Sequence, residues 1–101
     1  MRFRNRFASV VAAQLDLFER DNASLLDDCA RAEAAYDGAP RDEAEERYGD
    51  YLDLVAEGTQ VLAGMRDRYA STLDEPAAEE YEAAFNRAVA KRLRRFALEL
   101  D

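Results

Sequence analysis

The chain has 101 residues and a formal net charge of -8 at pH 7, with 49% hydrophobic and 36% charged residues. This length allows one domain at most, and the apolar fraction is too high for an intrinsically disordered chain. The acidic balance also disfavours partners such as nucleic acid, which attract proteins through their phosphates.

Apolar residues recur at alternating spacings of three and four along most of the chain, and this pattern predicts long helices that pack side by side. The first helix is predicted over residues 3–36. A break with a new helix start is the alternative around residues 21–24, but the spacing keeps its phase across Asn22, which favours one continuous helix. The predicted core positions of this helix are Val11, Leu15, Phe18, Asn22, Leu25, Cys29, Ala32 and Tyr36.

Two turns divide the rest of the chain. A glycine and a proline within residues 38–40 end the first helix, and a second helix, capped by Asp42, is predicted over residues 42–73. Pro76 follows acidic residues and opens a third helix over residues 76–100. Short turns make consecutive helices antiparallel, so we predict an all-α, single-domain, up-down-up three-helix bundle with coiled-coil packing. The later core positions are Tyr48, Tyr51, Val55, Gly58, Leu62, Met65 and Tyr69, then Tyr81, Phe85, Val89, Leu93, Phe96 and Leu100.

One polar residue, Asn22, falls on the core positions of the first helix. In the predicted bundle it lies level with the middle of the second helix, where Thr59 and Arg92 are candidate hydrogen-bond partners. Gly58 is expected there to let Phe18 approach the helix backbone. A seam asparagine usually fixes the register of the helices at some cost in stability. The alternative is a polar pocket around Asn22, Thr59 and Arg92, which would make the chain a small helical enzyme or ligand sensor.

The residues that carry most enzyme chemistry are scarce in this chain. It has no histidine, one cysteine and no glycine-rich phosphate-binding loop. Helical metal centres use inward-facing glutamates and histidines, and nucleophilic catalysis needs a base beside a serine or cysteine. Cys29 lies on the core seam, where it acts as a small apolar side chain. We therefore expect no metal, no cofactor and no catalytic site.

Near the end of the chain a basic stripe recurs at helical spacing. Its members are Arg87, Lys91, Arg94 and Arg95. The predicted bundle brings this stripe level with the acidic start of the second helix, and basic residues are also favoured at a helix C-terminus. Charge pairing within the bundle is the simplest role. The alternative function is an anion-binding module for nucleic acid or another acidic surface.

The first helix carries more apolar surface than a three-helix bundle needs. Phe3, Val10 and Leu17 recur every seven residues beside the core seam, with Phe7 between the two stripes. A wide core could absorb these side chains; otherwise they form an exposed interface. The leading hypothesis is a non-catalytic protein–protein interaction module that forms a homodimer, or binds another helical protein, through this face.

The sequence also bears on location. No segment approaches the 18 or so consecutive apolar residues that a membrane-spanning helix needs, so no membrane span is expected. A single cysteine cannot form an internal disulfide, which favours a reducing, cytoplasmic location. No motif of the sequence names the natural partner or pathway.

Overall fold

The computed structural model describes residues 5–100, except for the side chains of Leu98 and Glu99. Within this range the chain forms four α-helices, one 3-10 helix and no strand. They are α1 (Ala8–Asp21), α2 (Ala23–Asp37), α3 (Arg41–Ala70), α4 (Glu75–Arg92) and η1 (Arg94–Glu99). The all-α prediction is confirmed. The three-helix up-down-up arrangement is not confirmed, because the first and third predicted helices are each interrupted.

The two predicted turns lie close to their expected positions. α3 begins at Arg41 with Pro40 as its N-cap residue, so Asp42 lies in the first turn and does not cap the helix as predicted. There its negative charge still faces the positive end of the helix dipole. Asp74 caps α4, since its side chain accepts a hydrogen bond from the backbone N–H of Ala77 at 3.0 Å. This cap satisfies one of the free N–H groups that every helix start exposes.

α1 and α2 are separated by one non-helical residue, Asn22, with φ -120° and ψ 30°. Its side-chain amide donates to the carbonyl oxygen of Phe18 at 3.0 Å, the same acceptor that its backbone N–H uses at 2.9 Å. Asparagine side chains compete in this way with the regular hydrogen bonds of a helix, which favours a break. The prediction of one continuous helix is wrong, because apolar spacing keeps its phase across a one-residue interruption.

α4 ends at Arg92, and the chain turns at Leu93 into η1. The turn places Phe96 against Gly58 of α3 and edge to face with Phe18, with ring centroids 5.8 Å apart. Gly58 therefore admits an aromatic ring, as expected, but the ring is that of Phe96. The prediction that the third helix continues to residue 100 is wrong, since Phe96 is drawn back to the middle of the molecule.

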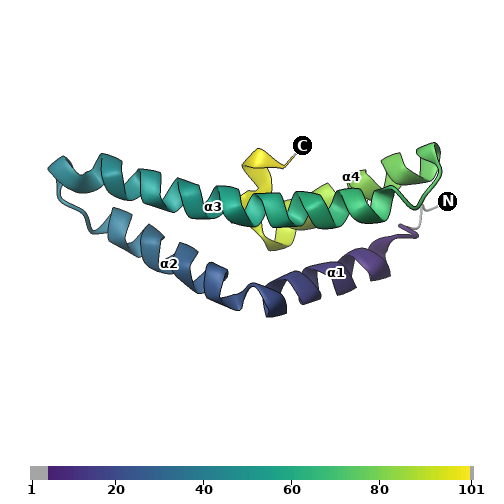
Figure 1. Cartoon of the computed structure of the whole chain (residues 1–101), viewed down its shortest axis with the longest axis horizontal. Coiled ribbons are helices and arrows are strands. Elements are labelled where there is room, and N and C mark those ends of the chain that lie inside the picture. The colour runs from purple at the N-terminus through teal and green to yellow at the C-terminus, as the bar shows by residue number, and fades with distance from the viewer. Residues whose placement is uncertain (1–4, 101) are drawn as a thin grey trace.

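The break at Asn22 lets the two halves of the first segment pack on different neighbours. α2 packs along the N-terminal half of α3, whereas α1 packs on α4, which itself lies against the C-terminal half of α3 (Figure 1). η1 contacts both α3 and α4 near the middle of α3. At the α4 end, Tyr81 stacks edge to face on Phe7 at 5.6 Å and contacts Tyr69 at 4.7 Å between ring centroids.

The buried apolar side chains form one cluster, and their distribution along the molecule is uneven. They are Phe7, Val11, Leu15, Phe18, Cys29, Val55, Leu62, Ala70, Tyr81, Ala84, Phe85, Val89, Leu93, Phe96 and Leu100. No residue from 30 to 54 is buried. The molecule measures 53 × 28 × 20 Å, and residues 30–54 form its α2–α3 end, which we call the arm.

Candidate protein-interaction surface

The arm and η1 together enclose a groove of about 460 Å³ on the outer face of α3. It is lined by Tyr48, Tyr51, Leu52, Asp53, Val55 and Ala56 of α3 and by Arg94 and Arg95 of η1. We call it the arm groove. α4 ends at Arg92, and η1 packs near the middle of α3, so neither covers the N-terminal half of α3. In Figure 1 α2 and α3 continue beyond η1 side by side. The arm groove is thus an apolar surface with a basic end.

Large apolar side chains of the arm are unusually exposed. Tyr48 is 44% exposed and Leu52 43%. Tyr36 of α2 is 37% exposed, and its ring centroid lies 5.0 Å from that of Tyr48. Two helices packed only on each other cover one stripe of each, so the outer surfaces of these side chains stay in water. Contiguous apolar surface of this kind is typical of interaction sites.

Arg95 joins the three elements that meet at the base of the arm. Its guanidinium pairs with Glu33 of α2 at 2.8 Å and lies over the ring of Tyr51, 5.7 Å from the centroid. Its Nε is buried and has no hydrogen-bond partner. Because the side chain is three-quarters covered and already paired, it fixes η1 against α2 and α3. The charge pairing predicted for this arginine does occur, but with Glu33 and not with the acidic start of α3.

The break at Leu93 also divides the predicted basic stripe. Arg87 and Lys91 are exposed on α4 and border a separate surface hollow with Ala84 and Ala88. Arg94 is exposed at the arm groove and forms no ion pair within residues 5–100. The four basic residues therefore contribute to two surfaces, and of these four only Arg94 adds an unpaired positive charge to the arm groove, beside the exposed carboxylate of Asp53.

The structure places the predicted first-helix interface only partly on the surface. Phe3 lies outside the described residues. Phe7 is 8% exposed, and Val10 is half-buried against the core. Leu17 is 40% exposed. Within the described residues, the wide core therefore buries Phe7 and covers part of the Val10 side chain. Leu17 remains exposed.

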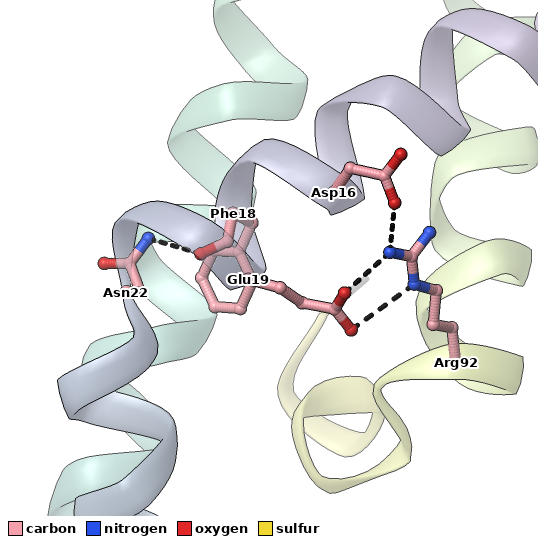
Figure 2. Close-up of polar contacts among 5 residues, drawn as sticks. All are labelled: Asp16, Phe18, Glu19, Asn22 and Arg92. Carbon is pink, nitrogen blue, oxygen red and sulfur yellow. Dashed lines mark hydrogen bonds and ion pairs between the residues drawn. The ribbon is translucent and has the colours of Figure 1, made fainter.

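The predicted polar cluster of Asn22, Thr59 and Arg92 does not form. Asn22 is occupied with the Phe18 carbonyl, and the Thr59 hydroxyl donates to the carbonyl of Val55 at 2.9 Å. Figure 2 shows Arg92 on the other side of α1, reaching Asp16 and Glu19. These carboxylates, with Glu19 at 2.6 Å, raise the pKa of Arg92 still further above its usual range. The reason for the separation is that each polar side chain finds a partner on its own helix or on the surface.

Residues 5–100 contain no group of three or more Cys, Asp or Glu side chains arranged to hold a metal ion. In the same range no helix combines the length and the apolar character that crossing a bilayer requires. Cys29 is fully buried, and burial raises the pKa of its thiol, so the reactive thiolate is disfavoured.

Comparison with protein-family models, with curated proteins and with solved structures finds no match to this chain. The arm groove offers apolar and aromatic side chains with one exposed cation. Such a surface can bind the apolar face of a helix.

Sequence reasoning did not single out the arm groove. Its main residue, Leu52, had one available signal: it falls beside the predicted core seam of α3, as Val10 and Leu17 do on α1. The sequence did not predict that α4 ends at Arg92. With the third helix continuing to residue 100, as predicted, this face was expected to be covered. Arg94 was singled out only as part of a stripe.

Proposed function

We propose that this chain is a non-catalytic protein–protein interaction module that self-associates through the arm groove. The observation that carries the proposal is the arm itself. Its 25 consecutive residues contain no buried side chain, and three of the exposed ones are the large apolar side chains of Tyr36, Tyr48 and Leu52. A helix from a second molecule laid on this face would bury these side chains. The cost of leaving them in water is about 25 cal/mol for each Å² of apolar surface, which association would recover.

The sequence-based hypothesis of self-association is thus kept, but its surface moves from α1 to the arm. The anion-binding alternative has less support, because Arg95 is paired with Glu33 and the remaining basic residues are divided between two surfaces. The ligand-site alternative has less support as well, because Asn22, Thr59 and Arg92 are bonded separately.

The test compares two matched variants, Leu52→Asp and Leu17→Asp. Both replace a leucine in the interior of a helix, and the two leucines are 43% and 40% exposed, so the intrinsic cost of the substitution is similar. Leu52 lies in the arm groove, whereas Leu17 belongs to the face predicted on the first helix. The mass of each protein in solution is measured by sedimentation equilibrium over about 1–100 µM, a range that detects weak and moderate association.

The proposal predicts that wild type and Leu17→Asp associate and that Leu52→Asp is monomeric, with association weakened by at least about tenfold, as expected for truncating and charging the centre of an interface. Circular dichroism of Leu52→Asp must show the helical content of wild type. A wild type that stays monomeric, or a Leu52→Asp variant of unchanged mass, refutes the proposal. Dissociation by Leu17→Asp alone would return the interface to α1.

A further inference from the structure

We infer, on the basis of the self-association proposed above, that the occupant of the arm groove is the arm of a second copy, paired antiparallel, with Glu45 of each copy against the partner's Arg94. The first support is charge complementarity. Arg94 is exposed and lines the groove, and Glu45 is exposed near the start of α3, outside the groove lining. Neither residue forms an ion pair within the described part of its own chain.

Helix geometry places Glu45 on this face. It lies seven residues before Leu52 and three before Tyr48, and residues three, four and seven apart share one side of an α-helix. Arg94 borders the groove together with Val55 and Ala56, about one turn beyond Leu52. This face of α3 therefore runs from Glu45, across the exposed Tyr48 and Leu52, to the part of the groove that Arg94 lines together with the exposed Asp53.

A two-fold axis across α3 close to Gly49 and Asp50 matches these features to each other. In an antiparallel pairing about this axis, Leu52 lies opposite the partner's Tyr48. In the same register Glu45 comes level with the partner's Val55, beside the partner's Arg94. An isologous interface repeats each contact twice, so the dimer contains two such charge pairs and two such apolar contacts.

The backbone near the axis is also free for close approach. A Cβ atom built on Gly49 would meet nothing within 4 Å, and the residue is exposed. Small residues at a helix crossing let two backbones approach and let longer neighbouring side chains interdigitate. Gly49, beside Tyr48 and three residues before Leu52, has this position. The resulting contact would join two α2–α3 hairpins into a four-helix arrangement. The α4 helix of each copy would lie outside this contact.

A charge-exchange experiment tests the pairing. Arg94→Glu places four carboxylates and no arginine at the two pair sites of a homodimer, and Glu45→Arg places four guanidinium groups there. Each homodimer should dissociate about tenfold more readily than wild type, since two attractive exposed pairs become two repulsive ones. In an equimolar mixture, the heterodimer restores opposite charges at both sites, so its affinity should return to that of wild type.

Arg87→Glu and Glu79→Arg are the matched controls, because they change the net charge by the same amounts at exposed positions of α4 away from the arm groove. Their homodimers should retain the affinity of wild type, measured by sedimentation equilibrium at the same salt concentration. Dimers that are unaffected by both arm variants, or weakened without recovery in the mixture, overturn this pairing while the self-association stands. A monomeric wild type overturns both, and leaves the groove to the helix of another protein.

Discussion

Gly58→Ala separates a local effect from a tertiary one, because helix propensity and packing predict opposite signs. Alanine in a helix interior is favoured over glycine by about 1 kcal/mol. At Gly58, however, a Cβ atom would lie 2.4 Å from Cε1 and 2.9 Å from Cζ of Phe96. Carbon atoms in contact are normally about 3.5–4.0 Å apart, so the ring must move by an ångström or more.

The movement has little room. Phe96 is 1% exposed, and its edge-to-face contact with Phe18 fixes one side of the ring. Overpacking a well-filled core costs about 1–3 kcal/mol. Loss of the aromatic geometry adds about 0.5–1 kcal/mol. After the gain in propensity is subtracted, Gly58→Ala should lower the free energy of unfolding by about 0.5–3 kcal/mol.

Gly49→Ala is the control in the same helix, because a Cβ at residue 49 meets nothing within 4 Å. It should raise the free energy of unfolding by up to about 1 kcal/mol. Both substitutions are made in the Leu52→Asp background, so that changes in association do not contribute. Urea unfolding followed by circular dichroism at 222 nm gives the difference in the free energy of unfolding between each variant and its parent. In a thermal scan, a difference of about 1 kcal/mol should move the melting temperature by about 4–8 °C.

A Gly58→Ala variant that gains as much stability as Gly49→Ala would refute the packing argument. The double variant Gly58→Ala, Phe96→Leu gives a second test. Leucine at residue 96 removes the atoms that the new Cβ would meet, so Gly58→Ala should become neutral or stabilising when it is measured against Phe96→Leu alone. An unchanged penalty in that background would show that its origin lies elsewhere.

Two further predictions concern titratable side chains of the core. Burial raises the pKa of Tyr81 to about 12 from its ordinary value of 10, and its hydroxyl donates a hydrogen bond to Gln14 at 2.6 Å. The stability that this shift contributes is therefore present below pH 10 and is lost as the pH rises to 12, by up to about 1.4 kcal/mol per pH unit. Tyr81→Phe should remove this pH dependence from the free energy of unfolding measured in urea. Cys29 is fully buried, so iodoacetamide should alkylate it about 100-fold more slowly in the native protein than in urea; comparable rates, followed by mass spectrometry, would contradict its burial.

Much of the core was predictable because the apolar spacing is a local property of the chain. All six core positions predicted in the third segment, from Tyr81 to Leu100, are buried. They remain buried although the chain leaves the α-helix at Leu93, because a turn followed by a 3-10 helix still directs Phe96 and Leu100 inward. The same persistence concealed the break at Asn22. The spacing was wrong in the arm, where the predicted core residues Tyr36 and Tyr48 are 37% and 44% exposed because no third helix covers them.

The candidate site was less predictable for a different reason. Leu52 and Leu17 have similar surroundings in the sequence, and both lie beside a core seam. Which surface remains open depends on how far α4 extends along α3, and that length is set where Phe96 packs against Gly58. A contact between residues 38 positions apart in the sequence leaves no periodic signal at either position.

By itself, the sequence determined the all-helical class, the two turns before α3 and α4, and the identity of most core residues. These features depend on proline, helix caps and the 3.6-residue repeat, which act within a few residues of each other. Only the tertiary structure decided that α1 packs on α4 while α2 packs on α3, and that the arm extends without a third helix. Those outcomes depend on which distant surfaces fit together, and van der Waals packing over long separations in the chain is decided by shape, not by local pattern.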